Sequence, residues 1–368
     1  MQLIYFAAVP WASFRQRPHE FAQWAHERLG ARVLWVEPYP VRLPQWQDLS
    51  RPSIAAAPMP TPAWLEIVAP RAFPLEPLAA GRRLNRALFW EPVIQRLSEF
   101  SARDAQTVAV IGKPSHLALH AMEDMGSLRF FYDAMDEFPA FHQGIARVAS
   151  ERIESEIVSR CAACSTSSSY LAGKLRERNR NVVLVPNGLA ANRMPALAAV
   201  DSANSPIGYV GTVGPWFDWA WVAELAAAWP ARCVEIHGPL YRTPSVALPA
   251  NVSLHPALAH DKALEKMNGF AAGLIPFLRN QLTASVDPVK YYEYRALGLP
   301  VLSTPFGEMR GRHEDTRVVL TEHPASDKAR IEALLGLRDT AESVAAFRLA
   351  NDWSVRFEPM AALLAPTA

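Results

Sequence analysis

The segment 287–301 combines residue types and spacing that could bind a nucleotide. It predicts a loop, a helix and a buried strand, because Pro288 suits the first helical turn and Gly298 suits a helix end. Unpaired N–H groups at the start of such a helix favour a phosphate, and Lys290 adds a positive charge there. Glu293 lies on the same helix face, where its carboxylate could accept both ribose hydroxyl hydrogens. The same spacing also describes an ordinary Lys–Glu pair on an exposed helix.

A glycine-rich loop could approach the same phosphates. Gly208, Gly211 and Gly214 end or follow a predicted strand, so the backbone at Gly211 and Thr212 could pass close to a diphosphate. The pattern is not the GxGxxG dinucleotide fingerprint. A glycine-rich turn is also common as a purely structural feature of α/β loops, and both interpretations stay open.

Two polar residues follow the strand that precedes this helix. Arg279 and Asn280 come after a predicted strand ending at Ile275. Ligands of open α/β folds bind at the carboxyl edge of the sheet, so we expect the pair to lie near the same ligand. A solvated loop is an equal alternative.

A group of carboxylates in the first half of the chain could supply a general base. Asp133, Asp136 and Glu137 crowd just past a predicted strand end, where mutual repulsion could raise the pKa of one of them. We predict that Asp136 is this base, with a residue without a catalytic role as an equal alternative. Asp133 is better explained as a turn or helix-capping residue.

Three basic or titratable residues lie at the first strand–helix junction. Arg15, Arg17 and His19 could hold an acceptor or the transferred group. A histidine in the first turn of a helix with no ligand explains the pattern equally well.

These residues must be positioned by alternating strands and helices. Residues 2–9 and 32–37 are predicted strands, and the amphipathic segment 18–29 predicts a helix between them that ends at Gly30. The alternation continues and is typical of parallel sheets covered by helices on both faces. The other predicted strands are 64–68, 107–111, 128–132, 162–165, 182–185, 207–210, 233–237, 252–254, 271–275 and 301–303.

Changes in composition and in the strand–helix pattern divide the chain into three parts. A run rich in Ala, Asn, Ser and Pro ends near Pro206, and a new strand–loop–helix pattern begins at Ile207. We therefore predict a Rossmann-like domain at 1–200, a second one at 201–340, and a C-terminal helical segment at 341–368.

Composition narrows the class of protein. With 368 residues the chain can form two α/β domains, and 37 Lys and Arg against 36 Asp and Glu give no field that favours nucleic acid. The apolar start lacks a basic leader, and no apolar run reaches the length of a membrane span, so we expect a cytoplasmic protein. Cys161 and Cys164 form a lone CxxC without a second pair, which favours core packing over a zinc site.

Five segments occur in the order found in bacterial glycosyltransferases of the GT-B fold. The string at 287–305 closely resembles the donor site of that family, and the others are 15–19, 132–138, 185–188 and 208–211. The chain is most similar to exopolysaccharide and cell-wall-glycan transferases, and more distantly to the glucuronosyltransferase of xanthan assembly. It lacks the two glutamates seven residues apart that mark the commoner branch.

The resemblance implies a fold and roles for the candidate residues. It implies two Rossmann-like domains that face each other across a cleft, with the C-terminal helix returning to the first. The nucleotide or diphosphate would be bound by Lys290, Glu293, Gly211, Thr212 and Tyr291. The donor sugar would meet Arg279 and Asn280, the acceptor Arg15 and Arg17, and catalysis would involve Asp136 and His19.

The implied reaction transfers a sugar from a nucleoside-diphosphate sugar to a glycan, lipid-linked or small-molecule acceptor. Lys290 and the helix start would stabilise the leaving diphosphate, so we expect no metal and no cofactor besides the co-substrate. The alternatives are a nucleotide-sugar epimerase or phosphorylase on the same frame and a non-catalytic binding subunit.

The acceptor is not readable from the sequence. Trp11, Phe14, Trp35, Trp46 and the pair Arg82-Arg83 could form a rim for a lipid-linked acceptor, with peripheral contact at the cytoplasmic face of the inner membrane. Packing in two cores explains the tryptophans at least as well.

Overall fold

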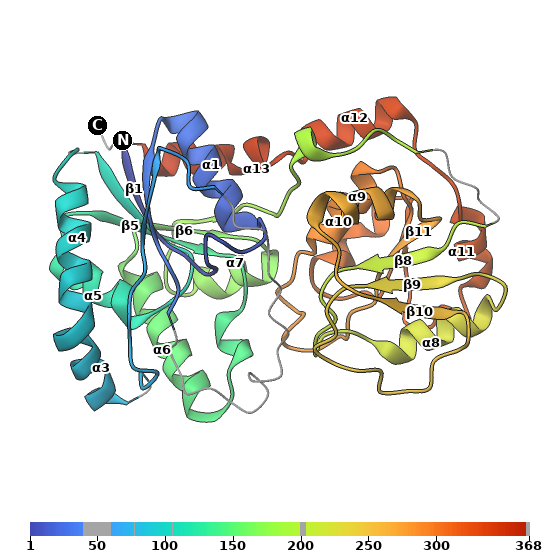
Figure 1. Ribbon diagram of the computed structural model, residues 1–368, viewed down its shortest axis with the longest axis horizontal. Helices are drawn as coiled ribbons and strands as arrows, with labels where there is room; N and C mark the ends of the chain where they lie inside the picture. The colour runs from blue at the N-terminus through green and yellow to red at the C-terminus, as the bar shows by residue number, and fades with distance from the viewer. Residues whose placement is uncertain (40–59, 77, 105, 199–203, 366–368) are drawn as a thin grey trace. The chain divides into compact units, whose positions relative to one another are not determined.

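The computed structural model describes residues 1–39, 60–76, 78–104, 106–198 and 204–365 (Figure 1). The chain forms two compact units, Met1–Pro186 with Phe357–Ala368, and Asn187–Arg356. The backbone thus enters the second unit after Pro186, and the predicted boundary at 200 lies outside the described residues. Each unit contains a parallel sheet with helices, as the alternating pattern predicted.

In the described part of the chain, the strands of the first unit are β1 (Gln2–Phe6), β2 (Arg32–Val36), β3 (Leu65–Val68), β4 (Thr107–Ile111), β5 (Arg129–Ala134), β6 (Ala163–Thr166) and β7 (Val182–Leu184). They form one parallel sheet in the order β3-β2-β1-β4-β5-β6-β7. All five residues of β1 and of β4 are buried, as expected for central strands covered on both faces. The direction of the strand order reverses between β1 and β4, which is where ligands of open α/β sheets usually bind.

The helices of the first unit are α1 (Arg17–Leu29), α3 (Ala79–Asn85), η1 (Arg86–Trp90), α4 (Glu91–Ser101), α5 (His116–Asp124), η2 (Phe138–Phe141), α6 (Gly144–Arg160) and α7 (Ser169–Arg176). Local signals explain α1. Pro18 lies in its first turn, and Gly30 ends it in the left-handed conformation at φ 64°. The predicted core packing of Cys161 and Cys164 is confirmed, since both are free and buried in this unit.

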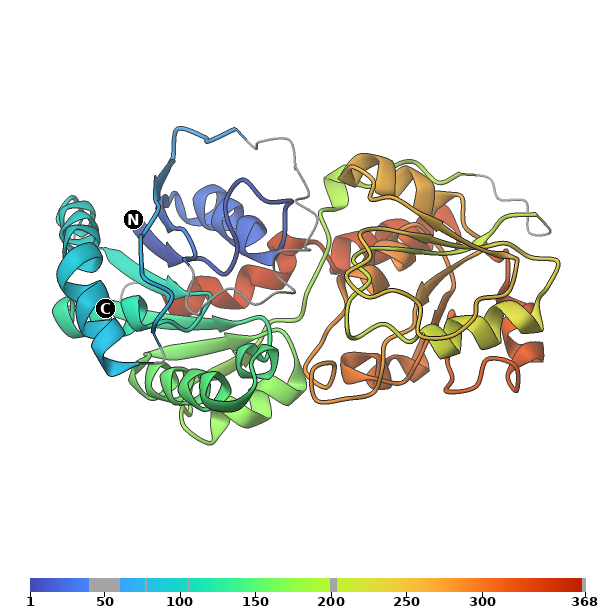
Figure 2. The ribbon, with the colours of Figure 1, turned by 60° about the horizontal axis from the view of Figure 1, so that its bottom comes forward.

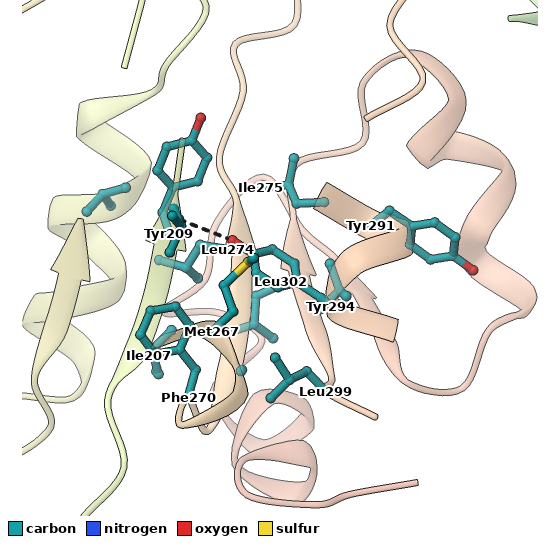
Figure 3. Close-up of a cluster of buried hydrophobic side chains, with 14 of the residues drawn as sticks. Ile207, Tyr209, Met267, Phe270, Leu274, Ile275, Tyr291, Tyr294, Leu299 and Leu302 are labelled. Carbon is teal, nitrogen blue, oxygen red and sulfur yellow. Dashed lines mark hydrogen bonds between the residues drawn. The ribbon is translucent and has the colours of Figure 1, made fainter. Parts of the chain in front are cut away.

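The second unit has a parallel sheet in the order β10-β9-β8-β11-β12-β13 within the described residues. Its strands are β8 (Ile207–Val210), β9 (Val234–His237), β10 (Val252–His255), β11 (Ala272–Ile275), β12 (Val301–Ser303) and β13 (Val318–Leu320). Its helices are η3 (Ala191–Arg193), α8 (Trp219–Ala228), α9 (His260–Asn268), α10 (Val289–Ala296), η4 (Gly307–Glu314), α11 (Lys328–Leu334) and α12 (Ala341–Ala350). Figure 3 shows part of the core between α10 and the sheet, where Tyr294 and Leu302 pack together.

The C-terminal segment forms two helices where the sequence predicted one. α12 packs in the second unit, where the ring of Phe347 lies 6.0 Å from that of Tyr291. The chain then turns at Asn351, and α13 (Trp353–Leu364) follows. In the first unit the Phe357 ring lies 5.3 Å from Phe21 of α1, and the end of α13 lies beside α1 (Figure 2).

Candidate active site

The burial of Lys290 and Glu293 distinguishes them from an ordinary surface pair. The Lys290 ammonium forms an ion pair with the Glu293 carboxylate at the start of α10, and the side chains are only 23% and 6% exposed. The pair Lys262–Glu265 on α9 has the same spacing, but its side chains are 68% and 57% exposed. Burying a charged pair costs desolvation free energy, which an exposed pair avoids. The arrangement suits a cationic group that meets an anionic ligand.

The glycine loop lies against Lys290. A Cβ atom added to Gly211 would lie 3.4 Å from Cε of Lys290, so the backbone after β8 and the start of α10 are neighbours. Gly238, after β9, approaches so closely that an added Cβ would lie 1.9 Å from the Gly211 carbonyl oxygen. The Thr212 carbonyl accepts a hydrogen bond of 2.9 Å from the Tyr209 hydroxyl, which fixes the loop. The structure thus brings together Gly211, Thr212 and Lys290.

The other two glycines of the motif are explained by packing. An added Cβ at Gly208 would lie 2.2 Å from the ring of Phe270, and one at Gly214 would lie 2.6 Å from the ring of Trp216. Each glycine therefore makes room for an aromatic ring, which is the structural alternative that the sequence left open.

The start of α10 is anchored by a buried aspartate that the sequence did not single out. Asp287 accepts a hydrogen bond of 2.8 Å from the backbone N–H of Asn187 and one of 2.8 Å from the Tyr292 hydroxyl. The Asn187 side-chain amide donates to the Asp287 carbonyl at 2.7 Å. Burial raises the pKa of Asp287, and the nearby Arg312 guanidinium opposes the rise. The motif at 185–188 thus holds the loop that precedes the candidate phosphate site.

Tyr291 does not lie with Lys290. Its hydroxyl donates to the Asp315 carboxylate at 3.0 Å, and the Arg312 guanidinium lies 4.4 Å from its ring. In Figure 3 its side chain points away from the strands of the core cluster. The residue directly after Lys290 points from a different face of α10, so the structure gives Tyr291 packing contacts there, and its predicted nucleotide contact stays a prediction.

Arg279 and Asn280 have partners within their own region. The exposed Arg279 side chain forms an ion pair with Glu322. The side-chain oxygen of Asn280 accepts a hydrogen bond of 3.1 Å from the backbone N–H of Thr283, which is a local turn. These contacts match the loop alternative, and a sugar contact would require Arg279 to leave Glu322.

Arg17 and Asp133 form a buried bidentate ion pair in the first unit. Two guanidinium nitrogens of Arg17 lie 2.8 and 3.1 Å from the Asp133 oxygens, and the side chains are 4% and 1% exposed. A third nitrogen donates to the Val185 carbonyl at 2.8 Å, and Ser165 donates to Asp133 at 2.7 Å. Asp133 is therefore the counter-ion of Arg17 and not a capping residue. The acceptor role predicted for Arg17 conflicts with these buried contacts.

Asp136 is the titratable group of this region whose environment suits a general base. It is half-buried, and burial raises its pKa to about 7, with the positive charge of Arg17 opposing the rise. Repulsion among neighbouring carboxylates, the cause predicted from sequence, is not what raises the pKa. Asp133 is paired with Arg17, and Glu137 accepts a hydrogen bond of 2.6 Å from Lys174. A carboxylate that titrates near neutral pH can accept a proton efficiently.

His19 and Arg15 are held by local contacts. His19 is fully buried, with Nδ1 3.2 Å from the Gln16 backbone nitrogen and Nε2 3.2 Å from the Trp11 carbonyl oxygen. Burial lowers its pKa, so the ring is neutral, and its contacts fit a proton on Nε2. These contacts give His19 a structural role in α1, and its predicted catalytic role stays a prediction. Arg15 pairs with Glu20 at 2.8 Å.

A pocket that the sequence did not reveal opens at the carboxyl ends of β1 and β2. Tyr39, Lys113 and Ser115 are among the residues that line it. The Tyr39 hydroxyl bonds the buried Glu76 carboxylate, and burial raises the pKa of Glu76 to about 7. Burial also lowers the pKa of Lys113. Gly112 and Lys113 directly follow β4, a position at the carboxyl edge of the sheet that the sequence could have indicated. Glu76 lies in a proline-rich segment without periodicity, which gave no such signal.

The predicted aromatic rim is only partly present. Trp11 and Trp35 are buried in the core, as the packing alternative has it, whereas Phe14 and Arg83 are exposed. Trp46 lies outside the described residues. Within the ranges that the structure covers, none of the helices is both long and apolar enough to span a membrane.

Several solved structures resemble this chain over nearly its whole length. Sucrose-phosphate synthase from Thermosynechococcus elongatus is 14% identical, with a TM-score of 0.66 over 99% of this chain and 98% of the other. Anabaena HepE in complex with UDP-glucose is 12% identical, with a TM-score of 0.62 over 99% of both chains. The chain has the GT-B fold. The lipopolysaccharide outer core galactosyltransferase WaaB, 11% identical with a TM-score of 0.62 over 98% of both chains, shares it.

The GT-B fold predicted from the motifs is thereby confirmed. No protein-family model matches the sequence, and a comparison with curated proteins gives no match either.

Proposed function

We propose that this protein is a glycosyltransferase. It transfers a sugar from a nucleoside-diphosphate sugar to a glycan, lipid-linked or small-molecule acceptor, without a metal ion. The observation that carries the proposal is the part-buried pair Lys290–Glu293 at the start of α10, against the Gly211 loop. The fold supports it, because Anabaena HepE, with the same fold, has structures with UDP and with UDP-glucose.

The residues of the second unit account for donor binding. The Lys290 ammonium, the N-terminal end of the α10 dipole and the backbone at Gly211 and Thr212 would stabilise the negative charge of the diphosphate as it leaves. Glu293 would accept hydrogen bonds from the ribose hydroxyls once Lys290 turns to the phosphates. These groups need no reorganisation of the backbone, because Asp287 and Asn187 already hold the loop before α10.

The residues of the first unit account for the acceptor. Asp136 would remove the proton from the acceptor hydroxyl, since its pKa of about 7 leaves it partly ionised at neutral pH. The pocket with Tyr39 and Lys113 lies at the switch point of the sheet and would hold a polar part of the acceptor. His19 and Arg17 would act only by positioning α1 and Asp133.

The proposal includes a cytoplasmic location with peripheral contact at the inner membrane. Leu84 and Leu88, one helical turn apart, are exposed next to Arg83. Apolar side chains flanked by arginine favour the surface of an anionic bilayer. Sedimentation with anionic vesicles tests this contact, which should weaken in Leu84→Glu/Leu88→Glu. Equal sedimentation of both proteins, or none by wild type, would remove the membrane from the proposal.

Calorimetric titration with UDP, GDP and dTDP, without metal, tests donor binding. We expect micromolar binding of one diphosphate by wild type and at least tenfold weaker binding by Lys290→Ala. Lys262→Ala is the matched control, because Lys262 has the same spacing to its glutamate on an exposed helix. Failure of all three diphosphates to bind, also with Mg²⁺, would refute the donor site and favour a binding subunit.

A further inference from the structure

A second cluster of charged and titratable residues lies in the first unit, on α4 and α5. His120, Glu123 and Asp124 occupy the last turns of α5, and Glu91 is the first residue of α4. The ligand atoms of Glu91, His120 and Asp124 all lie within 4.8 Å of one another. α5 begins at the carboxyl edge of the sheet, so its last turns lie away from the edge that carries Asp136.

The local sequence explains why these residues meet. Positions 120, 123 and 124 share one face of a helix, because residues three and four apart are neighbours on its surface. The helix from 79 to 101 is continuous, with a π-helical turn at Arg86–Trp90 just before Glu91 and Pro92. Proline inside a helix removes a hydrogen bond and displaces a carbonyl, and π turns occur frequently at functional sites.

His120 is the unusual member of the cluster. Its side chain is only 4% exposed, and neither ring nitrogen has a hydrogen-bond partner among the described residues. Its Nε2 atom nevertheless faces two carboxylates, 3.4 Å from Glu91 Oε1 and 3.5 Å from Asp124 Oδ2. A buried polar atom without a partner costs free energy, and a bound ion in contact with Nε2 would remove this cost.

The charges around His120 do not balance. Glu91, Glu123 and Asp124 surround the guanidinium of Arg86 at 3.4 to 3.5 Å, longer than a strong charge-assisted hydrogen bond of about 2.7–2.9 Å. Three carboxylates against one guanidinium leave a surplus of two negative charges. Glu123 and Asp124 also lie at the C-terminal end of α5, where the helix dipole disfavours anions. A divalent cation would neutralise this surplus.

We propose that Glu91, His120 and Asp124 bind a divalent zinc ion, with water completing the coordination. Ligands about 2.0–2.2 Å from a tetrahedral ion lie roughly 3.3–3.6 Å apart. The two distances from His120 Nε2 match this spacing. One imidazole with two carboxylates suits zinc, whereas Mg²⁺ prefers an octahedral set of oxygens. The ion would fix the end of α5 to α4, and the proposal is independent of sugar transfer.

Another cluster of similar composition is less suited to a metal. Glu235, His237 and His255 also group together in the second unit. There the Glu235 Oε2 atom already lies 2.6 Å from the Lys266 ammonium and 2.8 Å from His237 Nε2. The two imidazole rings are stacked at 4.4 Å, and His255 Nε2 lies 3.0 Å from the Ser253 hydroxyl, so this cluster already has partners of its own. We therefore assign the zinc site to α4 and α5.

Calorimetric titration of the untagged, chelator-treated full chain with Zn²⁺ tests the site. We expect one saturable ion per chain, bound at least tenfold more weakly by Glu91→Gln and by His120→Asn. Glu99→Gln is the control, because Glu99 is exposed on the same helix and lies outside the cluster. If His120→Asn fails to fold, Glu91→Gln still tests the zinc site, because Glu91 is exposed and its replacement leaves the core unchanged.

A spectroscopic measurement gives a second readout. Co²⁺ in place of Zn²⁺ should give the visible absorption of a tetrahedral site in wild type and in Glu99→Gln, and lose it in Glu91→Gln. Absence of saturable Zn²⁺ binding, or equal affinity in wild type and Glu91→Gln, would overturn the proposal. Binding of Mg²⁺ but not Zn²⁺ would overturn the choice of ion.

Discussion

Replacing Asp136 with asparagine should stabilise the protein at alkaline pH and slow the transfer reaction. Burial raises the pKa of Asp136 from 3.8 to about 7 in the folded state. Between these values the folded protein holds a proton that the unfolded chain has lost, so stability falls as pH rises, by 1.36 kcal/mol per unit. Above about pH 7 Asp136 is ionised in both the folded and the unfolded state, so its contribution to the free energy of unfolding no longer changes with pH.

The magnitude follows from the pH range that is compared. Between pH 5 and pH 8 wild type should lose up to about 2.7 kcal/mol of stability from this one group. Because Asp136 is half-buried and solvent screens its charge, we expect about 1–2.5 kcal/mol. Asp136→Asn cannot ionise, so its stability relative to wild type should rise by that amount over the same range. Its transfer rate should fall about 10²–10⁴-fold.

Urea unfolding of both proteins at pH 5 and pH 8 is the assay. Differences in shape or hydrogen bonding between Asp and Asn contribute nearly equally at both pH values, so they cancel in the comparison. An identical stability difference at pH 5 and pH 8 would refute the raised pKa of Asp136, and with it the reason for choosing this residue as the base.

Three further predictions concern packing and assignment. Gly238→Ala should weaken diphosphate binding at least tenfold, because the added Cβ would lie 1.9 Å from the Gly211 carbonyl oxygen. Gly173→Ala is the control, because a Cβ added there has no neighbour within 4 Å. Equal diphosphate affinities of the two variants would contradict the role of the Gly211 loop. Arg17→Met should lower the free energy of unfolding in urea by about 3–5 kcal/mol, because Asp133 would stay buried without its counter-ion. Arg15→Met should lower it by at most about 1 kcal/mol. Similar losses in both variants would contradict the importance of the buried Arg17–Asp133 pair. Tyr291→Phe should bind the diphosphate with an affinity within about twofold of wild type, measured by calorimetry, because the Tyr291 hydroxyl donates to Asp315. A tenfold loss of affinity would instead support the nucleotide contact predicted from sequence.

Local signals made much of the fold predictable. Pro18 and Gly30 bracket α1 in the sequence as they do in the structure, because first-turn prolines and left-handed C-cap glycines act within a few residues. The break between α12 and α13 was missed, although Asn351-Asp352 carries residues that favour helix ends.

Parts of the candidate site depend on contacts between distant residues. Arg17 meets Asp133, 116 positions away, and no spacing rule connects them. His19 is buried because Trp11 and Trp35 pack on its ring, which depends on how β1, β2 and α1 assemble. Lys290 and Glu293 were identifiable because one helical turn suffices to bring them together. Their burial, which separates a ligand site from a surface pair, required the structure.

The most direct test of the proposed transfer is consumption of a nucleotide sugar. Wild type, Lys290→Ala and Asp136→Asn would be incubated with UDP-, GDP- and dTDP-sugars and a panel of glycan and lipid-linked acceptors, and released nucleoside diphosphate would be measured. We predict acceptor-dependent release from one donor by wild type and at least a hundredfold lower rate in both variants. Binding of a diphosphate without any release by wild type, or full activity of both variants, would contradict the proposed enzyme.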